Sequence, residues 1–301
     1  MLEVARDGSV DRRVLLAFAG TALLAGSNIV AVVFSNRELP PFWGAGIRFV
    51  GAGVLMLVLV WVLRLPLPRG RALAGATSYG VLSFFVAYAT FYWGAQEVPA
   101  GVASVIMGAV PLLTLLLALA IGMERFRWRG LVGALLAVAG IAVISAEPPG
   151  GSLPVVPLLA IVAAATAAAG SGIVVKSLTE SHPVTTNAVA MMVGAVLLLA
   201  TSAVAGETAT LPTSASVWAA LMFLVFATPA LFVLFVYILQ RWTASAASYQ
   251  FVLFPLVSIV LAARLLREPV SASLLIGAPL VLVGVYVGAL RAAPAAAAPG
   301  C

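Results

Sequence analysis

The side chains that most often carry enzymatic chemistry are scarce in this chain. Its 301 residues include one histidine, His182 beside Pro183, and one cysteine, Cys301 at the last position. A catalytic triad or a zinc site needs several such groups brought together, so this inventory predicts neither. There is also no Gly-rich phosphate-binding loop, which excludes an ATP-driven pump built from this chain alone. We therefore expect no enzymatic activity, no cofactor and no metal site.

Arg48 is the only ionisable residue that lies well inside an apolar run. A charge at such a place costs at least about 2.5 kcal/mol on insertion scales, so the side chain should face the protein interior or water and have a partner. In one interpretation it attracts an anionic group such as a substrate carboxylate. In the other it braces helix or loop carbonyls near the outer side of a membrane.

The acidic residues occupy different positions from Arg48. All ten fall in predicted loops or at the ends of apolar runs: Glu3, Asp7, Asp11, Glu38, Glu97, Glu124, Glu147, Glu180, Glu207 and Glu268. Proton-driven antiporters commonly use a buried carboxylate, so this placement disfavours simple proton coupling and favours a facilitator. Glu124 and Glu268 stand just before the next apolar run, where a carboxylate favours the N-terminus of the following helix.

A repeated set of residues relates the two halves of the chain. An offset of 144 positions carries the first member of each of these pairs onto the second: Gln96/Gln240, Ala100/Ala244, Ser104/Ser248, Pro111/Pro255, Glu124/Glu268, Gly133/Gly277 and Gly140/Gly284. In a very hydrophobic chain, such a repeat is typical of a transporter made from two related halves. The glycines are spaced for close packing between helices.

The composition indicates a protein embedded in a membrane. Hydrophobic residues make up 63% of the chain and charged residues 9%, a ratio that a hydrated surface does not allow. Hydropathy predicts ten apolar helices of about the length that crosses a bilayer. They run at roughly 14–34, 41–63, 72–94, 98–122, 128–145, 155–177, 186–205, 216–239, 243–266 and 271–290.

The basic residues predict the orientation. With the N-terminus in the cytoplasm, twelve of the 16 basic residues fall on the inner side: Arg6, Arg12, Arg13, Arg64, Arg69, Arg71, Arg125, Arg127, Arg129, Lys176, Arg241 and Arg291. This bias places both termini in the cytoplasm and explains the positive net charge without nucleic-acid binding. Arg264 and Arg267 fall outside, as expected if the second half is inverted, whereas a nine-span alternative would place them inside.

These boundaries predict an all-α membrane protein with ten transmembrane helices in two inverted five-helix repeats. The first repeat spans 14–145, a linker spans 146–154, and the second repeat spans 155–290. Residues 1–13 form a cytoplasmic segment and residues 291–301 a disordered tail.

Several motifs resemble the EamA-type transporters of the drug/metabolite transporter superfamily. They are Ser27-Asn28, Arg48-Phe49, and Ala103-Ser104 followed by Pro111, Glu124, Gly133 and Gly140, with the second copy of that series. Ala25 stands where the family often has a tryptophan. The resemblance implies ten helices in two inverted repeats, a central cavity that opens alternately to either side, and export of small metabolites or drugs.

Polar and aromatic side chains mark the expected cavity, since buried polar groups need partners. We expect substrate contacts from Asn28, Tyr88, Ser104, Thr166, Ser248, Tyr249 and Gln250. Pro111 and Pro255 interrupt backbone hydrogen bonding within spans four and nine, whose faces are expected to meet. Each is either a ligand-facing hinge or a kink that shapes packing.

The sequence therefore predicts a secondary carrier in the cell inner membrane that exports small organic molecules by alternating access. Its expected partners are a small-molecule substrate and the lipid bilayer, and the protein is expected to be a monomer or a homodimer. The alternative is an integral membrane receptor or assembly protein that transports nothing.

Overall fold

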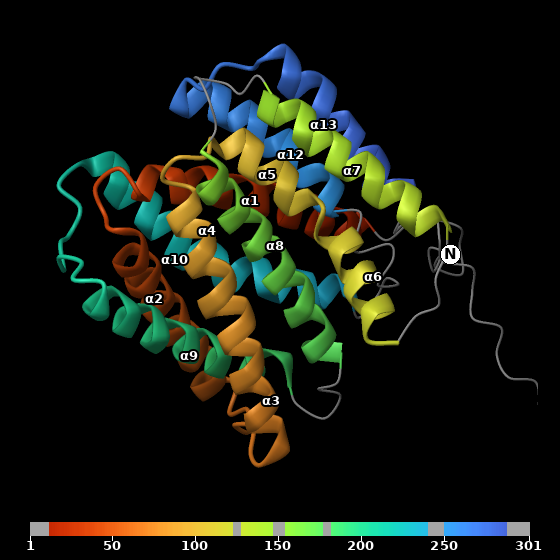
Figure 1. Cartoon of the computed structure of the whole chain (residues 1–301). Helices are drawn as coiled ribbons and strands as arrows, with labels where there is room; N and C mark the ends of the chain where they lie inside the picture. The colour runs from red at the N-terminus through yellow and green to blue at the C-terminus, as the bar shows by residue number, and fades with distance from the viewer. Residues whose placement is uncertain (1–11, 123–127, 147–153, 177–181, 240–249, 288–301) are drawn as a thin grey trace, which may run out of the picture.

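The computed structural model describes residues 12–122, 128–146, 154–176, 182–239 and 250–287, and within these ranges all regular structure is helical (Figure 1). The expected segment 1–13, linker 146–154 and tail 291–301 lie largely or wholly outside the described residues. The expected all-helical class is confirmed.

The first half of the chain forms helices at most of the expected positions. They are α1 (Arg12–Ser35), α2 (Pro41–Val62), α3 (Arg71–Tyr79), η1 (Gly80–Val86), α4 (Ala87–Gly94), α5 (Ala100–Gly108), α6 (Val110–Ala120) and α7 (Trp128–Ala146). Helices α3 and α4 are continuous with η1, a π-helical segment, and together they form one rod over the third expected span. The fourth expected span is broken at Ala109, where Pro111 occupies the first turn of α6. A proline is tolerated at that position because its missing N–H would be unpaired there in any case.

The described part of the second half is also helical. It comprises α8 (Val155–Lys176), α9 (Pro183–Val204), α10 (Ala215–Leu239), α12 (Gln250–Leu261), η2 (Ala262–Leu266) and α13 (Ala272–Val285). Pro255 lies inside α12 without ending it. The two prolines of the repeat therefore have different local effects.

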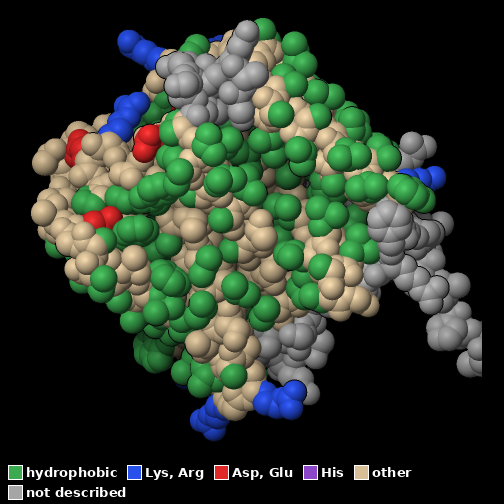
Figure 2. All heavy atoms as spheres, viewed as in Figure 1, with side chains coloured by type: hydrophobic (Ala, Val, Ile, Leu, Met, Phe, Trp, Pro, Cys, Tyr) green, Lys and Arg blue, Asp and Glu red, His purple; other side chains and the backbone are tan. Residues whose placement is uncertain are grey.

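Seven of the described helical segments are long and apolar enough to cross a membrane, and three shorter apolar helices cover Trp128–Ile144, Leu253–Leu266 and Ala272–Val285. Large apolar side chains are exposed on many of them, including Trp61, Val138, Val204 and Leu275. Figure 2 shows hydrophobic side chains spread over the viewed face, with Lys and Arg at its margins. A surface of this kind is suited to lipid. The expected number of ten spans stays a prediction.

The most extensive helix contacts join the first half to the second. Helix α2 packs on α9, α7 on α13, α1 on α10, and α4 on α8 (Figure 1). The two halves therefore interlock, and much of the buried core forms between them.

Glycines allow the closest of these contacts, as their spacing predicts. A Cβ atom placed on Gly277 would lie 2.6 Å from the carbonyl oxygen of Gly140, and one placed on Gly284 would lie 2.6 Å from that of Gly133. Real Cβ atoms do not approach a backbone oxygen so closely, so α7 and α13 meet only because these positions have no side chain.

Three glutamates hydrogen-bond helix N-termini in the opposite half of the chain. Glu268 accepts from the N–H groups of Ala100 (2.8 Å) and Gly101 (3.2 Å) at the start of α5. Glu207 accepts from Phe42 (3.2 Å) and Trp43 (2.7 Å) at the start of α2. These N–H groups have no partner within their own helices, and the positive end of each helix favours a carboxylate.

The third such residue, Glu38, accepts from the backbone N–H groups of Thr213 (2.6 Å) and Ser214 (3.1 Å) just before α10. We name Glu38, Glu207 and Glu268 the carboxylate caps. The expectation that Glu268 serves the helix that follows it was wrong, because its oxygens bond to α5, far away in sequence. Sequence proximity suggested α13, whereas the tertiary packing places the start of α5 against Glu268.

We expect Gly277→Ala to destabilise the protein by about 1–3 kcal/mol, because the new methyl group would overlap the backbone of α7. Thermal unfolding in detergent measures the loss. Gly172→Ala in α8 is the matched control, since a Cβ atom added there would have no described atom within 4 Å apart from the adjacent backbone of its own helix. Equal loss in the two variants would contradict the packing argument.

The cap made by Glu38 should depend on pH. Hydrogen bonds from Ser214 and Thr213 lower the pKa of the Glu38 carboxyl to about 2 from its ordinary value of 4.5. A lowered pKa means that the stabilisation is complete above pH 4.5 and is lost as the pH falls toward 2. We expect the difference in melting temperature between wild type and Glu38→Gln to shrink over that interval. A difference in melting temperature that stays constant over that interval would contradict the cap.

Candidate functional site

A buried arginine organises the polar interior. Arg48 is 0% exposed, and its guanidinium donates to the side-chain oxygens of three residues. One terminal nitrogen lies 2.9 Å from Oδ1 of Asn28 and 2.8 Å from Oγ1 of Thr228, while Nε lies 3.2 Å from the same Thr228 oxygen. The other terminal nitrogen lies 3.1 Å from the hydroxyl of Tyr92. We name Asn28, Arg48, Tyr92 and Thr228 the Arg48 cluster.

Four helices supply this cluster: α1, α2 and α4 from the first half, and α10 from the second. Gly51 permits the approach of α10 to α2, because a Cβ atom there would lie 2.9 Å from the side chain of Val225. Thr228 lies one turn after Val225. Its hydroxyl donates to the carbonyl of Leu224 at 2.7 Å, so its oxygen is left to accept from Arg48.

Aromatic rings surround the other faces of the guanidinium. The Arg48 Cζ atom lies 4.9 Å from the ring centroids of both Phe49 and Tyr88, within the range of cation–π attraction. The rings of Phe49 and Tyr88 meet edge to face at 4.6 Å, and Phe84 lies 5.3 Å from Phe49. Phe232 of α10 extends this group, at 5.3 Å from Phe84. We name Phe49, Phe84, Tyr88 and Phe232 the aromatic wall.

The cluster is rich in hydrogen-bond donors and positive charge. Within the described ranges, no carboxylate contacts Arg48, and its oxygen partners are all neutral side chains. The Nδ2 amide nitrogen of Asn28 is buried and has no hydrogen-bond partner among the residues described. These described partners are side-chain oxygens, and they differ from the interpretation in which Arg48 braces helix or loop carbonyls. The arrangement is chemically suited to receive an anionic or hydrogen-bond-accepting group.

The other expected site residues are arranged differently. Tyr88 belongs to the aromatic wall, but the Ser104 hydroxyl donates to the Gly101 carbonyl (2.7 Å) and the Thr166 hydroxyl to the Val162 carbonyl (2.8 Å), each within its own helix. Ser248 and Tyr249 lie outside the described residues, and only the backbone of Gln250 is described, at the start of α12. Their expected role in binding stays a prediction.

Sequence reasoning omitted two members of the cluster from the expected site. Tyr92 lies one helical turn after Tyr88 on the same face, a spacing that was available as a signal. Thr228 had a weaker signal, since it is a single hydroxyl beside Pro229 in a long apolar run. Only the packing of α10 on α2 connects it to Arg48.

Spans four and nine pack together through α5 and α12, whereas the expected meeting of their proline-bearing faces stays a prediction. The Ser258 hydroxyl of α12 donates to the Ala100 carbonyl at 3.4 Å, and Pro255 is buried. Pro111 lies beyond the break at Ala109 and is half-buried. The hinge roles of Pro111 and Pro255 stay predictions.

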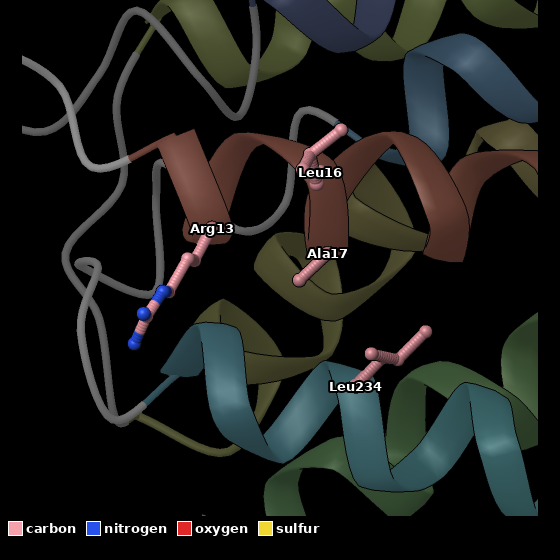
Figure 3. A pocket seen from close by; sticks show the side chains of 4 residues that line it. All are labelled: Arg13, Leu16, Ala17 and Leu234. Atoms are coloured by element: carbon pink, nitrogen blue, oxygen red, sulfur yellow. The ribbon is translucent and has the colours of Figure 1, made fainter.

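A surface hollow of about 410 Å³ lies between α1 and α10, lined by Arg13, Leu16, Ala17 and Leu234 (Figure 3). Ala17 points from α1 toward α10, whereas Leu16 points away from it. Arg13 is fifteen residues from Asn28, or about 22 Å along an α-helix. Leu234, on the α10 side of the hollow, is six residues from Thr228, or about 9 Å along the helix, and the hollow contains none of the expected substrate contacts.

The arrangement of long apolar helices around a buried polar cluster is that of a multi-pass membrane transporter. Similarity to known proteins agrees with this class. Residues 12–146 and 156–289 each match the EamA-like transporter family. The chain belongs to this family, as the sequence motifs suggested, and is a transporter rather than an enzyme.

Relatives with transporter names cover most of the chain. An uncharacterized transporter of Archaeoglobus fulgidus is 27% identical over 273 residues, which are 90% of this chain and 97% of the relative. The uncharacterized inner membrane transporter YedA of Escherichia coli K12 is 28% identical over 257 residues, covering 83% of this chain and 81% of YedA. A probable terminal-alkyne amino-acid exporter of Streptantibioticus cattleyicolor is 31% identical over 98 residues, one third of each chain.

A solved crystal structure has the same fold. It aligns with a TM-score of 0.66 and 20% identity, covering 93% of this chain and 97% of the other. At that identity the likeness supports the fold alone.

We expect Thr228→Val to destabilise the protein by about 1–3 kcal/mol, because valine keeps the shape but leaves two guanidinium N–H groups without their acceptor. Thermal unfolding in detergent tests this. Thr114→Val is the control, since the Thr114 hydroxyl donates only to Val110 in its own helix (2.9 Å); its effect should stay within about 0.5 kcal/mol. A loss no larger for Thr228→Val than for Thr114→Val would argue against the assigned role.

Proposed function

We propose that the protein is a secondary carrier that exports small organic metabolites or drugs across the cell inner membrane by alternating access. The Arg48 cluster is the observation that carries the proposal, because it places a buried polar site where helices of the two halves meet. Carriers built from repeats bind their substrates at such an interface and move one half against the other. Export also agrees with the name of the amino-acid exporter from Streptantibioticus cattleyicolor.

The proposed topology has ten spans in two inverted five-helix repeats, with both termini in the cytoplasm. The three shorter apolar helices lie where the fifth, ninth and tenth spans are expected, which supports this number. The contacts between helices also follow the 144-residue offset. This offset carries α1 onto α8, and it carries the rod from α3 to α4 onto α10. The contact of α1 with α10 therefore corresponds to a contact between α8 and the rod, and α8 does contact α4. Such a correspondence is what a twofold relation between the halves would produce.

In this topology all three carboxylate caps lie at the outer end of the bundle. Each joins one half to the other, so together they favour a state that is closed to the outside. Hydrogen bonds to a charged group are strong when they are shielded from water and weaker when water can compete for them. Hydrogen bonds of this kind can act as a gate, because they keep the outer end closed and can still break. Opening to the outside would break them.

The gate predicts a change in accessibility that can be measured in intact cells. Ser104 is fully buried one turn below Gly101, whose N–H group bonds to Glu268. In a Cys301→Ser background, we expect Glu268→Gln to raise the labelling rate of Ser104→Cys by a membrane-impermeant maleimide several-fold. Glu97→Gln removes a charge from another loop of the same side and should leave the rate unchanged. An unchanged rate in Glu268→Gln would contradict the gate.

Transport itself is tested in two steps. A resistance screen with cells that express the protein first ranks metabolites and drugs, and the purified protein is then reconstituted in liposomes loaded with the highest-ranked solute. We expect efflux above that of protein-free liposomes. Absence of efflux, with intact folded protein in the same liposomes, would favour a binding protein that does not transport.

A further inference from the structure

We propose that the Arg48 cluster binds the carboxylate of the transported molecule, and that the aromatic wall contacts its apolar body. The substrate class would then be an organic monocarboxylate with an apolar or aromatic group. This inference rests on the proposed carrier function for its transport step, whereas binding to the purified protein is independent of it.

The charge of Arg48 has no counter-ion among the described residues around it. Arg48 is 0% exposed and remains protonated at all physiological pH values, yet the described side chains around it are neutral. The described oxygens accept four hydrogen bonds from the guanidinium and two aromatic rings cover it, but none of these groups cancels its charge. A buried charge without a counter-ion is costly in a bilayer, so a bound anion would gain the attraction that no described side chain now supplies.

An unused hydrogen-bond donor, Nδ2 of Asn28, lies beside Arg48. Oδ1 of Asn28 accepts from Arg48, which leaves Nδ2 of the same amide next to the guanidinium and unpaired. Turning the amide over would place two donors against each other, so the arginine fixes this orientation. Asn28 is 7% exposed, and a buried amide N–H without an acceptor is unfavourable. Two neighbouring donor groups match the two oxygens of one carboxylate.

The aromatic wall offers an apolar surface for the rest of the ligand. Phe49 and Phe84 are fully buried, whereas Tyr88 and Phe232 are half-buried and are the members of the wall open to another molecule. Tyr88 touches the guanidinium, with its ring centroid 4.9 Å from Cζ, so the anionic and apolar contacts would be adjacent. The described part of the cluster has no carboxylate to pair with an ammonium group, so the inferred substrate needs no positive charge.

The test compares two probes that differ in charge at one group. N-acetyl-phenylalanine carries a carboxylate at neutral pH, and N-acetyl-phenylalaninamide has the same body with a neutral amide. Titration of the purified protein in nanodiscs should give a Kd at least about tenfold lower for the carboxylate, since charge-assisted hydrogen bonds exceed neutral ones. Equal affinity for the two probes would overturn the inference.

Variants then test whether the preference for the carboxylate probe arises from the Arg48 cluster. Arg48→Gln removes the charge and should abolish the preference, and Asn28→Asp should abolish it as well by giving Arg48 an internal counter-ion. Asn28→Asp keeps Arg48 in place and should raise the melting temperature, so it tests the site even if Arg48→Gln fails to fold. Asn187→Asp, another buried asparagine changed to an acid on α9, should keep the preference. A folded Asn28→Asp protein that still prefers the carboxylate tenfold would contradict the site.

The binding and transport results separate the two proposals. If the purified protein prefers the carboxylate probe but liposomes show no efflux of any screened solute, the carrier function fails and the anion site stands. If solutes are transported and the carboxylate has no advantage, the anion site fails and the carrier function stands.

Discussion

Arg48 keeps its positive charge inside an apolar bundle, and the helices around it are arranged to accommodate that charge. A guanidinium does not lose its proton in a protein, so it must be surrounded by acceptors and polarisable groups. Asn28, Tyr92 and Thr228 bring three oxygens from three other helices, and the rings of Phe49 and Tyr88 cover its faces. The positions of α1, α2, α4 and α10 relative to one another are therefore linked to a single side chain.

Elsewhere in the bundle, some helices are joined by close packing and others by polar hydrogen bonds. Between α7 and α13, glycines let the two backbones come into direct contact. At the N-termini of α2, α5 and α10, the carboxylate caps use a few hydrogen bonds that water can replace. In the proposed carrier, the glycine contact would form a lasting part of the structure and the caps a releasable one.

The sequence could predict a feature when one residue type or one regular spacing was enough to require it. A charge in an apolar run must be buried and partnered, and that requirement alone identifies Arg48. Glycines seven residues apart predicted a close helix pair, and α7 and α13 form it. Asn28 and Tyr88 were likewise expected in the site, since polar or amphipathic side chains in apolar runs require partners. Ser104 and Thr166 met the same criterion, but each hydroxyl is satisfied by a carbonyl of its own helix.

By itself, the sequence determined the membrane-embedded helical class, the duplication and the buried charge, because hydropathy, residue spacing and the cost of charge burial are properties of short segments. The tertiary structure alone decided that Arg48 bonds to Thr228 and that Glu268 bonds to α5. Both contacts join residues more than 160 positions apart across the two halves, and they depend on which helix faces pack together. Packing depends on shape complementarity over whole helices, and that information is not contained in any one motif.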